Sequence, residues 1–427
     1  MQKNMTSGSP LSLMVGFVIP IFVGNLFQQL YLMSDTLIVS RLLGVEALAA
    51  VGSVSPFSYM VAGFAQGLTM GFTAILSQRF GAGDNEGMRK VYAMSTLLSV
   101  LISFLLSIVF TFLSRPMLKL VNTPDNILDM AVEYISIIYI FLIFQVLYNL
   151  YAGVLRSLGD SKSPLVFMII SAVTNIILDI IAIAVFHMGV GGAALATVFS
   201  QGLSAILSFI YIKKKFTILT PSKEEKKYDR SLSKVLLKVG LPGAFQYSIT
   251  AISCILVQAS LNNFGSDSVA AYSVANKIEN MVTQFYPALG IGISTFAGQN
   301  LGAGKLKRVR KGFRVSVYLN IAYSIFALII CQSFASPMSK LFIDSNTSSP
   351  VVIEESILYV TTMSLFFIPL GFIFIFRTGC QGLGSGKIPM ISAIIELVAR
   401  TCTAFSLPYF FGFLGICYSN AVSWISA

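Results

Sequence analysis

Long apolar runs alternate with short polar stretches along the whole chain. Most of the runs reach the ~20 residues that an α-helix needs to cross a bilayer. Several contain proline or glycine, which membrane bundles tolerate because neighbouring helices satisfy the freed carbonyl groups. The twelve predicted spans are residues 14–38, 47–76, 91–113, 131–155, 164–186, 190–212, 236–258, 268–296, 312–334, 354–378, 389–411 and 413–427. The pattern predicts an all-α membrane protein with twelve transmembrane helices.

The composition excludes a soluble globular protein. Only 11% of the residues are charged and 55% are apolar, whereas a soluble domain carries about a quarter charged residues. The net charge of +11 comes from basic residues in short segments between apolar runs, so we expect no nucleic-acid partner. The five cysteines form no CxxC motif and His187 is the only histidine. We therefore expect no metal site and no cofactor, and the lack of a nucleophile–base pair argues against an enzyme.

The basic residues also indicate an orientation. If the spans alternate, 22 of the 29 Lys and Arg residues lie on the side of the N-terminus, including Arg156 in the loop after the fourth span. Only Arg41, Arg115, Lys119 and Lys340 lie on the opposite side. By the positive-inside rule both termini face the cytoplasm. We expect a multi-pass protein of the cytoplasmic membrane.

The chain repeats itself at an offset of about half its length. The segment RFGAGDNEGMRK at 79–90 returns as NLGAGKLKRVRK at 300–311, and LGDSKSP at 158–164 returns as LGSGKIP at 383–389. Two turns with the sequence GAG, called the GAG turns below, lie within the first pair. Ordered matches of this kind indicate a duplicated architecture.

The repeat predicts two lobes of six spans each. Residues 1–212 form the first lobe, 213–235 a charged cytoplasmic linker, and 236–427 the second lobe. Because six spans return the chain to its starting side, the lobes are expected to be related by a pseudo-two-fold axis along the membrane normal, with a cleft between them. The last span ends about eleven residues short of its repeat partner, so we expect a truncated last helix.

Four carboxylates fall inside the spans, where charges are expensive and default to functional candidates. In the first lobe, Asp35 ends a polar stripe on the first span that also contains Asn25 and Gln28. Asn175 and Asp179 lie four residues apart on the fifth span and therefore share a face.

Thr197 on the sixth span completes this set. The groups could converge on a pocket that holds a proton or Na⁺, because desolvation and like-charge repulsion both favour neutralising such carboxyl groups. A purely structural polar network between helices is the alternative.

The second lobe has a different set of charges: Lys277, Glu279, Arg377, Glu396 and Arg400. Glu396 and Arg400 are four residues apart and can pair directly. Lys277 and Glu279 point to different faces and need separate partners. We favour internally neutralised ion pairs and keep direct contact with substrate as the alternative.

The run LYLMSDTLIVSRLLGVEALAAVG at 30–52, the GAG turns and the six-plus-six repeat resemble the multidrug and toxic compound extrusion (MATE) transporters over essentially the whole chain. The resemblance implies a V-shaped pair of lobes and cation-coupled export of amphipathic, often cationic compounds.

Within that family the first lobe is similar to the DinF-like branch. There, an Asp on the first helix, an Asn-x-x-x-Asp on the fifth and a Thr on the sixth form the ion site, which Asp35, Asn175, Asp179 and Thr197 match one by one. Pro20 matches a first-helix proline whose bending is linked to protonation in that branch. The NorM-like branch has an acidic residue on the seventh helix, which the span at 236–258 lacks.

These observations favour a monomeric antiporter that exchanges H⁺ or Na⁺ for a small-molecule substrate. The alternative is a flippase for a lipid-linked precursor with the same V-shaped architecture. A flippase requires a basic cavity lining, and Arg377 and Arg400 are the ambiguous candidates for it.

Overall fold

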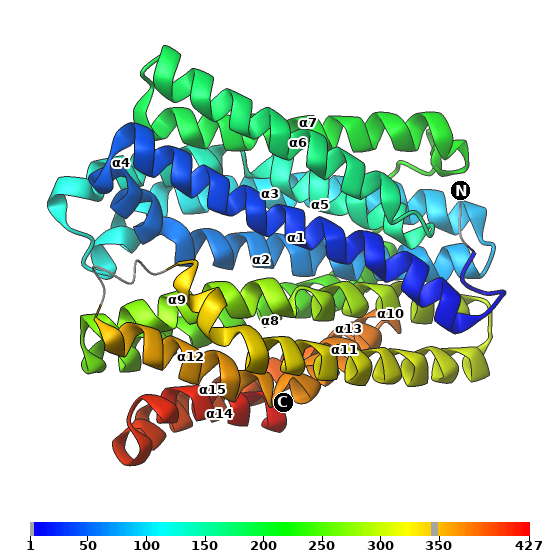
Figure 1. Ribbon diagram of the computed structural model, residues 1–427. Coiled ribbons are helices and arrows are strands. Elements are labelled where there is room, and N and C mark those ends of the chain that lie inside the picture. Colours follow the sequence, from blue (N-terminus) through cyan, green and yellow to red (C-terminus); the bar gives the residue numbers. More distant parts are fainter. Residues whose placement is uncertain (1–3, 343–348) are drawn as a thin grey trace.

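The computed structural model of the chain describes residues 4–342 and 349–427, and every regular element within them is a helix (Figure 1). The first half contains α1 (Pro10–Leu43), α2 (Val45–Gly81), α3 (Asn85–Leu120), α4 (Asp125–Ile140), α5 (Leu142–Ser157), α6 (Lys162–Ile180), the π-helical turn η1 (Ile181–Val185) and α7 (Gly189–Lys215). After the 3-10 turn η2 (Thr217–Leu219), the second half contains α8 (Arg230–Leu261), η3 (Asn262–Phe264), α9 (Ser266–Thr283), α10 (Phe285–Gly302), α11 (Leu306–Lys340), α12 (Pro350–Ser364), α13 (Phe367–Gly382), α14 (Lys387–Phe411) and α15 (Phe413–Ser426).

Every predicted span coincides with a helix or a pair of helices. Within the described residues, eight helices are long and apolar enough to cross a membrane, and two bent pairs raise the number to ten: α4 with α5, at 48°, and α12 with α13, at 55°. The span predicted at 268–296 is divided into α9 and α10, which meet at Gln284. Because α9 contains many polar residues, α9 and α10 together do not form a continuous apolar segment. The last predicted span is the 14-residue α15.

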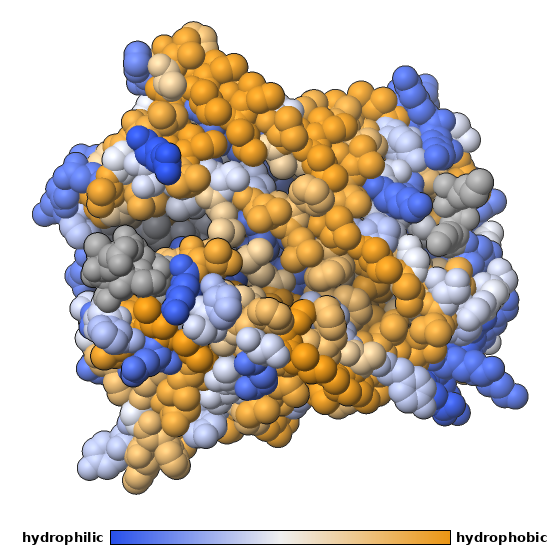
Figure 2. Space-filling view, in the orientation of Figure 1, coloured by the Kyte–Doolittle hydropathy of each residue, from blue (hydrophilic) through white to orange (hydrophobic). Residues whose placement is uncertain are grey.

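The molecule is a multi-pass membrane protein built from two bundles (Figure 1). Helices α1–α7, here called the N-lobe, and α8–α15, the C-lobe, each enclose an apolar core of their own. Figure 2 shows a broad apolar band across the middle of the face in view, with hydrophilic residues at both ends. This distribution fits a bilayer core flanked by polar headgroup regions.

The turns of the two lobes have matching backbone geometry. The paired glycines at corresponding positions have nearly equal positive φ angles: Gly44 and Gly265 at 87° and 88°, Gly83 and Gly304 at 70° and 71°, Gly159 and Gly384 at 82° and 86°, and Gly189 and Gly412 at 59° and 58°. Positive φ values favour glycine because it has no Cβ. The two halves of the chain thus repeat the backbone conformation of their turns as well as their sequence.

The lobes are packed tightly against each other at the end that contains the GAG turns. A Cβ added to Gly81 would lie 1.8 Å from the carbonyl oxygen of Gln299, and one on Gly302 would lie 1.9 Å from that of Gln78. The side chain of Gln299 donates to the carbonyl of Ser157 across the interface at 2.8 Å. Among the described residues, the hydrogen bonds between lobes extend from these turns only as far as Asn25, midway along α1. The hydrogen bonds between the lobes are therefore concentrated at the end with the GAG turns, called the joined end below.

Candidate ion and substrate sites

The N-lobe site lies where α6 packs between α1 and α7. Asp35 on α1, Asn175 and Asp179 on α6, and Thr197 on α7 are all buried, and the exposed fraction of Asn175 and Asp179 is 0%. The structure thus brings together the four residues that the sequence selected. Three separate helices supply them, so their positions depend on how these helices pack.

The hydrogen bonds around Asn175 order this site. With the amide oriented to satisfy both of its groups, Nδ2 donates to Oδ2 of Asp179 at 2.8 Å and the amide oxygen accepts from the backbone N–H of Thr197 at 3.2 Å. The carboxyl groups of Asp35 and Asp179 are close enough to interact directly. One oxygen of each, Oδ1, is buried without a hydrogen-bond partner in the described chain. Two buried carboxyl groups with free oxygens and no basic neighbour form a site suited to a proton or a small cation.

Two tyrosines next to this site were missed by the sequence reasoning. Tyr31 and Tyr134 both lie beside Thr197 and the two carboxyl groups. Tyr31 precedes Asp35 by one helical turn, so helical spacing could have identified it. Tyr134 lies on α4, and no pattern in the sequence links α4 to this site.

The polar stripe expected on α1 does not converge on the N-lobe site. Asn25 and Gln28 instead line a cavity between the lobes, and Nδ2 of Asn25 donates to the carbonyl of Gln284 in the C-lobe at 3.2 Å. The reason is the oblique course of α1 (Figure 1), whose first half packs on α10 and whose second half packs on α6. Residues on one face of a long helix therefore meet different neighbours. Pro20 lies within this uninterrupted helix.

The C-lobe contains a buried charge triad. Glu396 lies between two arginines, with its carboxylate 2.7 Å from Arg377 and 2.5 Å from Arg400. The predicted Glu396–Arg400 pair is therefore present, and Arg377 from α13 joins it. Hydroxyl groups satisfy the arginines further: Nε of Arg377 donates to Ser392 at 2.7 Å and Nε of Arg400 to Ser423 at 3.1 Å.

Lys277 and Glu279 have separate partners, as their spacing on α9 predicted. Glu279 accepts a hydrogen bond from the hydroxyl of the buried Tyr359 at 2.7 Å. The ammonium of Lys277, on an exposed side chain, lies 5.9 Å from the centre of the Phe342 ring. Neither residue belongs to the triad.

A cavity of about 130 Å³ lies between the lobes, lined by α1, α2, α5, α6 and α10. Its lining is mostly polar, and Arg156 is the one charged residue that the described chain contributes to it. The sequence reasoning placed Arg156 in a cytoplasmic loop, but it occupies the last turn of α5 and lines this cavity. The error arose because α5 runs two residues further than the apolar pattern does.

Comparison with known proteins identifies the architecture. The MatE family model matches residues 20–181 and 242–405, which together make up most of the chain. The chain belongs to the MATE family of membrane transporters.

This chain aligns with most of the length of its curated relatives. It is 30% identical to "Probable multidrug resistance protein YpnP" of Bacillus subtilis, over 90% of this chain and 84% of that one. It is 27% identical to "FAD transporter" of Shewanella oneidensis, over 89% of this chain and 83% of that one.

Solved MATE structures share the fold. An outward-facing multidrug resistance MATE transporter superposes with a TM-score of 0.92 at 23% identity, covering 99% of this chain and 94% of that one. A transporter of the same superfamily from Pyrococcus furiosus gives 0.92 at 24% identity, with 99% and 95% covered. The MatE model matches once in each lobe, in agreement with the internal repeat.

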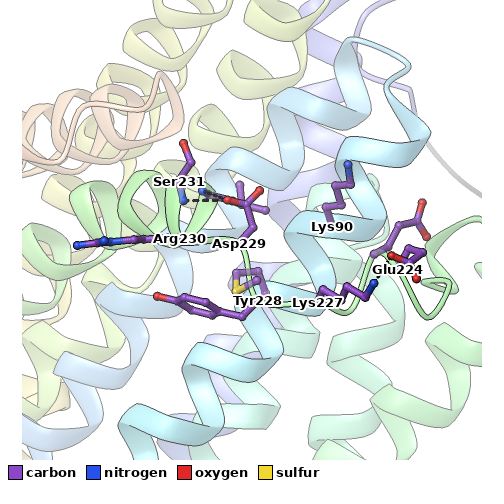
Figure 3. A pocket seen from close by; sticks show the side chains of 10 residues that line it. Lys90, Glu224, Lys227, Tyr228, Asp229, Arg230 and Ser231 are labelled. Atoms are coloured by element: carbon purple, nitrogen blue, oxygen red, sulfur yellow. Dashed lines mark hydrogen bonds and ion pairs between the residues drawn. The ribbon is translucent and has the colours of Figure 1, made fainter.

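A second, larger cavity of about 380 Å³ lies at the linker between the MATE lobes (Figure 3). Its charges serve local structure: Asp229 caps α8 by accepting from the backbone N–H groups of Ser231 and Leu232 at 2.8 and 3.0 Å, and Lys227 pairs with Glu224 at 2.5 Å. Next to it, Nε of Arg89 donates to both carboxylate oxygens of Glu225 at 2.8 and 2.9 Å. These hydrogen bonds lower the pKa of Glu225 to about 2. They attach the linker to the N-lobe. The charged residues around this cavity therefore serve to hold the linker in place.

Proposed function

We propose that this MATE protein is an antiporter of the cytoplasmic membrane that couples the entry of H⁺ or Na⁺ to the export of amphipathic small molecules. The observation that carries the proposal is the pair of buried carboxyl groups, Asp35 and Asp179, each with an oxygen that lacks a hydrogen-bond partner in the described chain. Like charges repel strongly in a low-dielectric site, so one positive ion shared between them lowers the energy of the site.

The course of α1 supports a route from ion binding to lobe movement. Its second half carries Asp35 into the N-lobe, and its first half packs on α10 of the C-lobe through Phe17, Val18 and Ile21. An ion that binds more tightly in one arrangement of α1 shifts the equilibrium between the two arrangements of the lobes. With both termini in the cytoplasm, the joined end lies inside and the cleft opens outward.

The relatives support this substrate class, since they are named multidrug resistance proteins, multidrug export proteins and an FAD transporter. Export of amphipathic molecules fits these names, and we propose that a single copy of the chain performs it. The candidate phosphate ligands of the flippase alternative, Arg377 and Arg400, are both engaged by Glu396, so these two residues do not support it.

Transport into inside-out vesicles tests this function. Rhodamine 123 serves as the probe, and a pH gradient and a Na⁺ gradient are imposed separately. We expect one of the two gradients to drive accumulation in wild-type vesicles and not in vesicles without the protein. Accumulation that needs neither gradient, or that fails with a panel of amphipathic dyes, would overturn the proposal.

A further inference from the structure

The cavity between the lobes has a positive charge in its lining and no negative charge from the described residues. Of the residues that line it, Arg156 is the only charged one, and the lining contains no Asp or Glu. The neutral phenol groups of Tyr148 and Tyr247 lie near the Arg156 guanidinium. Within the part of the chain that the structure describes, Arg156 forms no ion pair. This sets it apart from Arg377 and Arg400, which share Glu396.

The neighbours of Arg156 offer hydrogen-bond donors to the same space. Asn149 lies seven residues before Arg156 on α5, on the same face, and Gly153 between them packs against Thr73 of α2, which also lines the cavity. Gln28 and Gln66 line the cavity from α1 and α2. In the described chain none of these three amide side chains is engaged in a hydrogen bond, so all can donate to a ligand.

We propose that this cavity binds an anionic group, a carboxylate or a phosphate, of the exported substrate, with Arg156 as its counter-ion. A half-buried cation without an ion-pair partner is available to a ligand, and an anion with several oxygens satisfies both the guanidinium fork and the amide donors. At about 130 Å³ the cavity is smaller than the ~300 Å³ at which drug-sized pockets begin. It therefore takes the charged group, while the apolar remainder of the molecule lies in the cleft.

This inference rests on the proposed function, because it names the substrate class of the same cleft. It also has a structural competitor: a cation in the last turn of α5 interacts favourably with the helix dipole. The competitor predicts that removing Arg156 lowers stability and leaves ligand selectivity unchanged.

A matched pair of dyes tests the inference without any gradient. Rhodamine 110 has a free carboxylate and rhodamine 123 is its methyl ester, so the two differ only in that group. Binding to the purified protein in phosphatidylcholine nanodiscs is measured by fluorescence anisotropy. We expect wild-type protein to prefer rhodamine 110 by roughly tenfold or more, the range for a hydrogen-bonded charge.

The variants assign the preference to one residue. Arg156→Gln should abolish it, and Arg156→Lys should retain much of it. Lys162→Gln removes an exposed charge just beyond α5 and should leave it intact. Melting temperatures verify that each variant is folded. Equal binding of both dyes by wild type, or an unchanged preference in folded Arg156→Gln, would overturn the inference.

Competition identifies the source of the anion. Inorganic phosphate represents a soluble substrate and dihexanoyl phosphatidic acid a lipid headgroup. Displacement of rhodamine 110 by either supports an anion site and names its source, whereas displacement by neither contradicts it. Because the readout is binding, a failure of gradient-driven transport would count against the antiporter and not against this site.

Discussion

Asp35 and Asp179 set the chemistry of the N-lobe, because the described chain offers no basic residue to neutralise them. Asp35→Asn and Asp179→Asn each replace a carboxyl group by an uncharged amide of nearly the same shape. We expect both to abolish gradient-driven export in vesicles while binding of rhodamine 110 in nanodiscs persists. The physical reason is that a permanently neutral side chain gives the ion gradient no differential affinity to act on.

The neutral ligands serve as matched controls for this prediction. Asn175→Ala and Thr197→Ala each remove one uncharged partner and leave both carboxyl groups in place, so they should raise the ion concentration needed for half-maximal export without abolishing it. Full export by the Asp35→Asn protein would remove this site from the mechanism.

Glu396 has the opposite character, since it is neutralised from two sides. Glu396→Gln leaves Arg377 and Arg400 buried with unpaired charge, and breaking a buried pair in this way costs about 3 kcal/mol or more. We expect a clear drop in the melting temperature in detergent. Asp129→Asn, which breaks an exposed pair with Arg115, should cost less than about 1 kcal/mol. A Glu396→Gln protein of normal stability that cannot transport would make Glu396 a functional residue instead.

The sequence revealed the residues that helical spacing connects and missed those that only packing connects. Asn175 and Asp179 were found because they lie one turn apart inside an apolar span, and the Glu396–Arg400 pair was found for the same reason. Tyr134 and Arg156 were missed. Tyr134 reaches its site from α4, which no sequence pattern links to that site. Arg156 lies at the end of α5, where the sequence pattern is that of a loop.

At the scale of elements, the linker between η2 and α8 is attached to α3 by Glu225 and Arg89. Because the pKa of Glu225 is lowered from 4.5 to about 2, this attachment stabilises the linker above pH 4.5 and is lost as the pH falls towards 2. Limited proteolysis should therefore cut residues 216–229 faster as the pH falls through this window. Glu225→Gln should be cut rapidly at all pH values, and equal rates for the two proteins at pH 6 would contradict the prediction.

The close approach of the GAG turns is a second property of elements. Gly81→Ala places a methyl group against the carbonyl of Gln299, and overpacking of this kind costs about 1–3 kcal/mol. We expect a lower melting temperature and slower export. Gly52→Ala, on the same helix with nothing within 4 Å of the added carbon, should be neutral or stabilising by up to about 1 kcal/mol. Equal effects of the two substitutions would show that the contact is unimportant.

A helix or a pair of helices lies at each of the twelve spans that apolar periodicity predicted, yet the pattern did not predict that three of them are interrupted. The bend between α4 and α5 occurs at Phe141, with no proline or glycine at the break. At the bend between α12 and α13, Pro369 follows the break and cannot donate to the carbonyl of Leu365. The apolar pattern continues through both bends. The division at Gln284 was similarly hidden, since polar residues on α9 were taken as isolated charges within one span. Composition and apolar periodicity predict the type of element, but apolar periodicity does not show where a span is interrupted.

At the scale of the whole molecule, alternating access requires the joined end of the lobes to separate. In this structure the Cβ of Ser77 on α2 lies 3.0 Å from the ideal Cβ position of Gly298 on α10, within reach of disulfide formation after a small adjustment. All five native cysteines are free and can be replaced first. Oxidising the Ser77→Cys/Gly298→Cys double variant should then join the lobes at this end and stop export, because the cleft can no longer open on the cytoplasmic side.

The reversal of this block separates a conformational lock from damage to the protein. Reduction should restore export to the rate of the unoxidised double variant, and each single cysteine variant should be insensitive to oxidant. Binding of rhodamine 110 supplied from the outer side should survive oxidation, since the locked state keeps the outer cleft open. An oxidised, cross-linked protein that exports at its full rate would mean that the two lobes do not separate here during transport. The cleft between them would then be a fixed feature and alternating access would have to arise within a lobe.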